Sequence, residues 1–331
     1  GRWHVKCITK HPGIDNVIVS RRDLGVAAAT SEEFHRQYGG HASFGFTDIT
    51  NEDDLKRDLD KHQPKLVSIA VRDPIRGFVP QRELTSTVLE HSNAKVFCEK
   101  PIDDPRKEDD LGYLEGLASK FGDSNRFGYN LPSVLFAREM CKDPRLANYL
   151  DNAASVSFYW SSIEDTDKII ADLGLHITPF FMGYTIKDPV VDNYGNRAEI
   201  QFTLQSPDGE REIRASAPLE RDNNFRGIAV CPQNREEGSY IIALDVDGVN
   251  NTLYTPHKSL FGRKDLREED IRKNPIGQTV VNPLAIGINA LLDGKPAVGL
   301  REALEHQRLL CGLVGMDGVS TPHERHDYSA S

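Results

Sequence analysis

Three continuous apolar runs in the first 128 residues constrain the fold of this chain more than any other feature. They lie at residues 17–19 (Val-Ile-Val), 66–71 and 95–98. Continuous runs of this length are typical of strands that are buried on both faces of a parallel sheet. Helical patterns alternate with them, at residues 2–11, 24–38, 52–61, 82–91 and 104–121. Repeated strand–helix units predict a parallel sheet with right-handed crossovers, and such sheets bind ligands at the carboxyl ends of their strands.

From residue 129 onward the pattern changes. Segments at residues 154–160, 198–204, 212–217 and 240–246 alternate apolar and polar side chains, which predicts antiparallel strands with one covered face. Two apolar helices, at residues 283–292 and 300–316, close the chain. With 331 residues, two domains are expected. We predict an α/β Rossmann-type parallel-sheet domain at 1–128 and an α+β domain with an open, mostly antiparallel sheet at 129–331.

Charge and composition exclude several classes of protein. The formal net charge is −10 and no basic cluster is present, so a nucleic-acid partner is not expected. No apolar run approaches the roughly 20 residues of a membrane helix, and the first residues do not have the pattern of a signal peptide. The five cysteines are scattered without metal-ligand spacing. These features predict a cytoplasmic protein with reduced thiols and no metal site.

The strongest candidate for chemistry is Lys100. It follows the apolar run 95–98 directly, between Glu99 and Pro101, at the carboxyl end of a predicted strand. A lysine ammonium at this place can donate hydrogen bonds to a ribose or to a substrate hydroxyl. The alternative is a solvated Glu–Lys pair at the end of a strand.

Asp172 and His176 form a second candidate. Residues four apart share one face of a helix, so the two side chains should project together. Histidine is well suited to exchange a proton near neutral pH, and a neighbouring carboxylate can orient the ring. A purely structural histidine is the alternative.

Two further segments could bind the phosphates of a dinucleotide. Gly1-Arg2-Trp3-His4 could end a glycine-rich loop that enters a helix. Ser20-Arg21-Arg22 follows the 17–19 run, where an NAD-selective domain usually has an acid; arginines there would suit the 2′-phosphate of NADP. The alternatives are a chain end without function and two solvated arginines.

Together these segments resemble the glucose–fructose oxidoreductase/inositol dehydrogenase/MocA (Gfo/Idh/MocA) family. The similarity spans nearly the whole chain and rests on several motifs in the family's order. These motifs are the strand with Glu99-Lys100-Pro101, the crossover Phe127-Gly128-Tyr129-Asn130, the Asp172-x-x-x-His176 helix, and the tail 288–296 with Leu300-Arg301-Glu302-Ala303-Leu304.

The resemblance implies roles for these residues. Lys100 would lie beside nicotinamide and substrate, and Asp172 and His176 would line a sugar or polyol pocket. The acid/base would be His176, with Lys100 as the alternative. The cofactor contacts implied are the remaining residues of these segments: Gly1, Arg2, Trp3, His4, Ser20, Arg21, Arg22, Ala70, Val71, Arg72, Pro74, Glu99, Lys100 and Asn130.

Three departures from the family pattern affect these expectations. The family's first strand and first two loop glycines are absent from the sequence, which begins at the position of the third glycine. The usual Thr-Pro-Asn is replaced by Val71-Arg72-Asp73-Pro74, which leaves the nicotinamide contacts open. Arg21 replaces the usual acid, which favours NADP(H) over NAD(H).

The resemblance implies an oxidoreductase that transfers a hydride between nicotinamide and a carbinol or keto carbon of a sugar, polyol or sugar derivative. We expect a homo-oligomer, a dimer or tetramer, formed through the exposed sheet face. Two alternatives are a regulatory protein that binds NADP or a sugar without turnover, and an NAD-dependent glycosidase. Several arginines in the segment 206–237 could contact an anionic sugar, but interleaved acids favour a solvated loop.

Overall fold

A computed structural model describes most of the chain. The described residues are 2–70, 81–100, 102, 108–142, 146–162, 169–193, 197–221, 226–234, 240–246, 250–254 and 275–314. The chain divides into two compact units. The first comprises Gly1–Asp103, Gly112–Asn130 and Pro283–Ala303, and the second comprises Asp104–Leu111, Leu131–Asn282 and Leu304–Ser331. Residues 283–303 thus belong to the first unit although they lie near the end of the chain.

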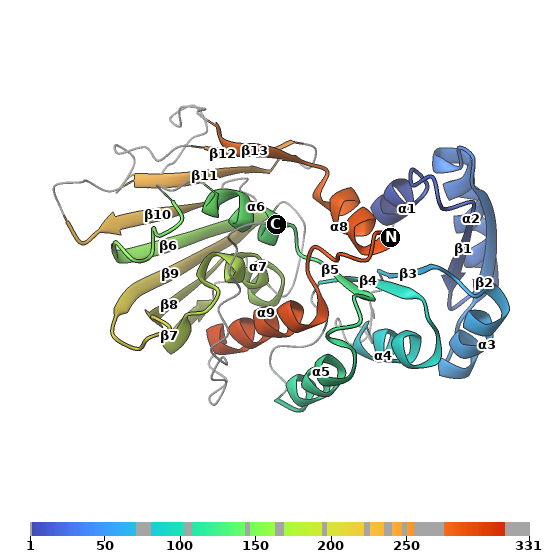
Figure 1. The fold of residues 1–331 in the computed structure, drawn as a ribbon, viewed down its shortest axis with the longest axis horizontal. Coiled ribbons are helices and arrows are strands. Elements are labelled where there is room, and N and C mark those ends of the chain that lie inside the picture. The colour runs from blue at the N-terminus through green and yellow to red at the C-terminus, as the bar shows by residue number, and fades with distance from the viewer. Residues whose placement is uncertain are drawn as a thin grey trace. The chain divides into compact units, whose positions relative to one another are not determined.

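The first unit alternates helices and strands (Figure 1). Its elements are α1 (Arg2–Ile8), β1 (Asn16–Arg21), α2 (Leu24–Tyr38), β2 (Ser43–Asp48), α3 (Glu52–His62), β3 (Leu66–Ile69), α4 (Gln81–His91), β4 (Lys95–Glu99), most of α5 (Glu108–Phe121), β5 (Phe127–Asn130), α8 (Pro283–Leu292) and the start of α9 (Leu300–Leu313). All strand pairs among the described residues of this unit are parallel: β1 pairs with β2, and β4 lies between β3 and β5. The predicted parallel sheet is confirmed.

The strand β4, in the middle of the ladder β3-β4-β5, explains why the apolar run at residues 95–98 is continuous. Val96, Phe97 and Cys98 are all at most 1% exposed, because the helices α4 and α8 both pack against β4. Phe97 packs in one cluster with Ile288 and Leu291 of α8. The ammonium of Lys95 donates to the carbonyls of Leu291 and Leu292, at 2.8 and 2.6 Å, and so caps the carboxyl end of α8 on the sheet.

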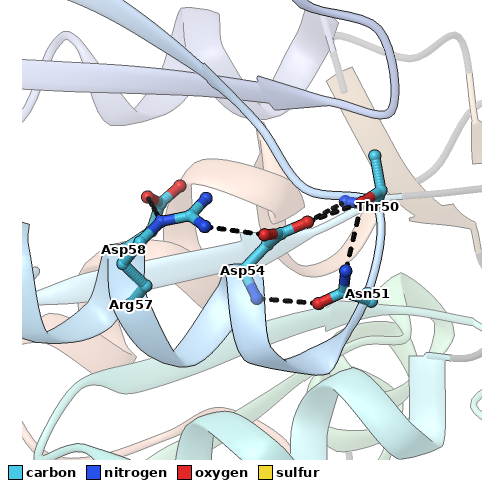
Figure 2. A network of polar contacts seen from close by, with 5 residues as sticks. All are labelled: Thr50, Asn51, Asp54, Arg57 and Asp58. Carbon is cyan, nitrogen blue, oxygen red and sulfur yellow. Dashed lines mark hydrogen bonds and ion pairs between the residues drawn. The ribbon is translucent and has the colours of Figure 1, made fainter.

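A polar network holds the start of α3 (Figure 2). The side chain of Asn51, the N-cap residue, accepts from the Asp54 amide at 2.9 Å. The carboxylate of Asp54 accepts from the amide and hydroxyl of Thr50 and from Arg57. These bonds, those of Thr50 foremost, lower the pKa of Asp54 to about 2. The first backbone N–H groups of a helix have no partner within the helix, and the bond from the Asp54 amide to Asn51 satisfies one of them.

The second unit is built on one sheet of eight strands, in the order β13-β12-β11-β10-β6-β9-β8-β7. Its elements are α6 (Pro132–Cys141), β6 (Ala153–Ser162), α7 (Ile169–Ile177), the 3-10 helix η1 (Thr178–Phe181), β7 (Thr185–Asn193), β8 (Arg197–Gln205), β9 (Glu212–Arg221), β10 (Gly227–Pro232), β11 (Tyr240–Val246), β12 (Asn250–Tyr254), β13 (Pro275–Val281) and the rest of α9. Every pair is antiparallel except β6 with β9. The predicted open, mostly antiparallel sheet is confirmed.

One face of this sheet is covered. Along β8, alternate residues from Ala198 to Leu204 are buried, as a half-covered strand requires. They pack with η1 and α7 in a core that also takes in Leu309 and Leu313 of α9. Gly174 lets α7 and α9 approach closely, since a Cβ there would lie 3.2 Å from Leu310. The helix that carries His176 is therefore fixed against the core.

Within the described ranges, no helix is both long and apolar enough to cross a bilayer. The same part of the chain holds no group of three or more His, Cys, Asp or Glu side chains that could bind a metal ion.

Candidate functional site

Polar side chains meet at the carboxyl ends of β3, β4 and β5. The carboxylate of Glu99, the last residue of β4, accepts from Nε2 of His4 at 2.5 Å and from the amide of Asn130 at 2.7 Å. The other ring nitrogen of His4 lies 2.6 Å from the hydroxyl of Ser68 in β3. Because β4 and β5 pair in parallel with Glu99 opposite Asn130, their ends are held at one edge of the ladder. This is the edge at which ligands of parallel sheets bind.

The hydrogen bonds set the charge state of this cluster. Burial raises the pKa of Glu99, but the hydrogen bond and charge of His4, the amide of Asn130 and the charge of Lys100 together hold that pKa below its ordinary value. An ionised Glu99 can only accept, so Nε2 of His4 carries the proton. His4 is 2% exposed and its ring also meets the edge of Phe97 at 5.4 Å. Its side chain is thus directed at Glu99 and Ser68.

Lys100 follows this cluster at the end of β4 and is half-buried. The positive charge of its ammonium helps to lower the pKa of Glu99, so the two charged groups interact. Ala70 directly follows β3 and is also half-buried. Gly1, Val71, Arg72 and Pro74, the other expected cofactor contacts nearby, lie outside the described residues.

The remaining expected cofactor residues lie on α1 and at the carboxyl end of β1. Arg2 pairs with Glu33 at 2.9 Å, and Trp3 is 65% exposed with the ammonium of Lys6 over its ring. Arg21, the last residue of β1, donates to the carbonyl of Ser20 at 3.2 Å.

Arg22 follows Arg21 and is exposed. Asp23 follows in turn and caps α2 by accepting from the Val26 amide at 2.8 Å. The Asp23 carboxylate is therefore engaged with its own helix, and the two arginines remain the candidate contacts for a phosphate.

In the second unit, His176 lies near the end of α7. Its imidazole stacks on the indole of Trp160 in β6, with ring centroids 4.8 Å apart and an angle of 8° between the planes. Nδ1 of His176 lies 3.4 Å from the hydroxyl of Ser133 in α6. The guanidinium of Arg226 lies over the same indole, 5.3 Å from its centroid. Asp172 also lies on α7, one turn before His176, and only its backbone is described.

A second histidine of this unit, His306 in α9, has no exposed surface. The hydroxyl of Thr178 donates to the Leu175 carbonyl at 2.8 Å, so it accepts from Nδ1 of His306 at 2.9 Å. Burial, with a smaller contribution from Arg138, lowers the pKa of His306 to about 3. The ring is therefore neutral and structural.

Sequence reasoning missed Ser68, Ser133 and Trp160. The two serines had no distinguishing signal, because their roles depend on which strands and helices are neighbours. Trp160 ends the alternating segment 154–160, and nothing in that pattern singles it out as a functional residue. In the structure it is 4% exposed, and its ring also forms the surface under His176.

The parallel ladders of the first unit and the eight-stranded sheet of the second define a class of fold. It is the fold of oxidoreductases and dehydrogenases of the Gfo/Idh/MocA type, to which the similar solved structures belong. The fold expected from the sequence is therefore confirmed. No protein-family model matches the chain, and no curated protein matches it either.

Three of the similar structures illustrate the likeness. The oxidoreductase domain protein from Kribbella flavida has a TM-score of 0.62 at 15% identity, over 95% of this chain and 93% of that one. Levoglucosan dehydrogenase, solved with NADH and levoglucosan, has a TM-score of 0.60 at 10% identity over 95% and 93%. The myo-inositol 2-dehydrogenase from Lactobacillus plantarum has a TM-score of 0.58 at 14% identity over 93% and 91%.

Proposed function

We propose that this protein is a nicotinamide-dependent oxidoreductase that transfers a hydride to or from a carbinol or keto carbon of a sugar, polyol or sugar derivative. The observation that carries the proposal is the polar cluster at the carboxyl ends of three parallel strands, with Lys100 beside it. The known substrates and cofactor of similar structures, levoglucosan and NADH in one and an inositol in another, support the substrate class.

The residues present fit a dinucleotide. Arg21 and Arg22 supply cationic donors at the carboxyl end of β1, where the adenosine ribose of a Rossmann-bound cofactor lies. Asn130 and Lys100 supply donors at the ends of β4 and β5, with Ala70 at the end of β3. We therefore favour NADP(H) over NAD(H). When bound, the nicotinamide supplies the carbon that accepts or gives the hydride.

The proposed work of the protein is to hold the substrate oxygen and to move its proton. In the direction of oxidation, His176 takes the hydroxyl proton at Nε2, because Nδ1 is directed at Ser133. Lys100 donates a hydrogen bond to the oxygen as negative charge develops on it. Asp172, one turn earlier on α7, is proposed to orient His176. The mechanism requires Lys100 and His176 to act on one substrate, and this stays a prediction.

The domain roles follow from the same proposal. Residues 1–128 would bind the cofactor, and residues 129–331 the substrate, while the exposed face of the eight-stranded sheet would support a dimer or tetramer. A cytoplasmic location belongs to the same proposal.

Two measurements on the purified protein test the proposal. Thermal shift with NADP⁺ and NAD⁺ should reveal cofactor binding, with the larger shift for NADP⁺. With NADP⁺, the absorbance of the reduced nicotinamide should then rise with a member of a panel of myo-inositol, levoglucosan and D-glucose. With NADPH, it should fall with the oxidised form of that member. Cofactor binding without turnover of any carbohydrate in a broad panel would favour the regulatory alternative. Glycoside cleavage without accumulation of reduced cofactor would favour the glycosidase.

A further inference from the structure

The imidazole of His176 lies flat on the indole of Trp160. Their planes differ by 8°, whereas the pair Phe158–Phe181 in the same core is tilted by 59°. A parallel stack with centroids 4.8 Å apart covers one face of the imidazole. One face of His176 is therefore closed to a substrate, and the plane of its ring is parallel to a surface that Trp160 provides.

Trp160 is itself held from several directions. It is 4% exposed and belongs to the main core of the second unit, where its ring meets Phe180 at 6.3 Å. Arg226 lies over the indole, and its Nε donates to the carbonyl of Ser161 at 2.8 Å. Because protein interiors are close-packed, an indole enclosed in this way cannot change rotamer without opening a cavity. Its plane is a fixed reference for His176.

A second contact limits rotation of the imidazole within that plane. Ser133, at the start of α6, has no exposed surface, and its hydroxyl lies 3.4 Å from Nδ1 of His176. The stack on Trp160 sets the plane of the ring, and Ser133 sets the direction of Nδ1. Nε2, on the opposite side of the ring, is then directed by the same two contacts.

We infer that Trp160 is a positioning residue for the proposed proton transfer, acting through its stack on His176. The inference rests on the proposed function, in which His176 exchanges the substrate proton. Displacement of a reacting group by about 1 Å can reduce a rate about a hundredfold. Loss of the indole would let the imidazole tilt, and the rate of the chemical step would fall.

Turnover of two variants tests the inference, with the substrate found in the panel above and NADP⁺. Trp160→Leu removes the flat surface, and its kcat should fall by about tenfold or more, while the Kd for NADP⁺ stays within about twofold. Trp160→Phe keeps a flat ring, so its kcat should stay within about threefold of the wild type. A merely structural role would lower the stability of Trp160→Leu without a selective loss of kcat.

Phe202→Leu is the matched control. Phe202 is 5% exposed, lies in the same core and meets Phe181 at 5.8 Å. Its truncation should destabilise the unit as Trp160→Leu does and leave kcat unchanged. An equal kcat in Trp160→Leu and Phe202→Leu would overturn the inference. No turnover by the wild type with any carbohydrate of the panel would mean that the proposed function is wrong. Full turnover by His176→Asn would mean that His176 does not exchange the substrate proton; if His176→Asn is inactive and Trp160→Leu is fully active, only the role of Trp160 is wrong.

Fluorescence provides a test that does not depend on the folding of the Leu variant. The chain has two tryptophans, so in a Trp3→Phe background the emission comes from Trp160 alone. An imidazole stacked on the indole alters its emission, so His176→Asn should change the emission intensity of this protein. Unchanged emission would show that the stack is absent and would overturn the inference.

Discussion

One carboxylate oxygen of Glu99 accepts hydrogen bonds from both His4, at 2.5 Å, and Asn130, at 2.7 Å. The bonds join a helix near the start of the chain to the ends of β4 and β5, which are about a hundred residues further on in sequence. Because hydrogen bonds to a charged group are stronger than neutral ones, this junction fixes the end of β4, and with it the backbone that carries Lys100.

Replacement of His4 by Asn should destabilise the protein. The shorter side chain cannot reach both partners, so Glu99 loses a donor and Ser68 loses a buried contact. Removal of one partner of a buried polar pair costs about 1–3 kcal/mol, measured as a lower free energy of unfolding in urea. His35→Asn is the control, since His35 is exposed and should change stability by less than about 0.5 kcal/mol. Equal stability of the two variants would mean that the junction contributes nothing.

Replacement of Lys100 by Met should reduce kcat by about a hundredfold to a thousandfold, as the loss of one donor to a developing oxyanion does. The Kd for NADP⁺, measured by titration, should change far less. Lys120→Met is the matched control because Lys120 is exposed and pairs with Glu90 on the surface. Unchanged turnover in Lys100→Met would remove Lys100 from the mechanism.

Cofactor selectivity should depend on Arg21 and Arg22. Replacement of both by Ala should weaken NADP⁺ binding by about a hundredfold or more, since each hydrogen bond to a charged group contributes about 1.5–3 kcal/mol. NAD⁺ binding should be nearly unaffected, because NAD⁺ lacks the 2′-phosphate. Arg36→Ala, an exposed change at the other end of α2, should alter neither constant. Equal weakening of both cofactors would argue against a 2′-phosphate contact.

His306 should make stability depend on pH. Its pKa is about 3 in the fold against an ordinary 6.5, so between these values the unfolded chain binds a proton that the folded chain does not. The free energy of unfolding should therefore fall as the pH is lowered from 6.5 toward 3. Glu99 acts in the same direction, since its lowered pKa also makes acid destabilising.

The variant His306→Asn separates the two contributions. It keeps a donor for Thr178 and cannot titrate, so its urea midpoint should fall less steeply with pH than that of the wild type. Identical slopes in the two proteins would mean that His306 is not neutral in the fold.

Regular elements with one dominant pattern were predictable from sequence. The bounds of α2, β11 and α8 match their predicted ranges, because each depends on an uninterrupted local pattern. The short strand β2 was missed: none of its residues is buried, and Gly45 interrupts its two phenylalanines. β7 was missed as well, because its register shifts between Lys187 and Val190, so the alternation of side chains breaks.

The site residues were predictable from sequence only where a local motif contained them. The sequence placed Glu99 at the end of a strand and Asn130 in a crossover segment, and the structure brings their side chains together. The direction of His4 toward Glu99 depends on how α1 packs against the sheet, which no local pattern reports. The stack of His176 on Trp160 likewise joins two segments through the core.

Transfer of a carbon-bound deuterium tests the central claim most directly. The protein would be incubated with NADP⁺ and a substrate labelled at its carbinol carbon, and the reduced cofactor analysed by mass spectrometry. The account predicts that the deuterium appears at C4 of the nicotinamide with the wild type and is almost lost with Lys100→Met. Reduced cofactor without deuterium, or equal labelling by the variant, would contradict it.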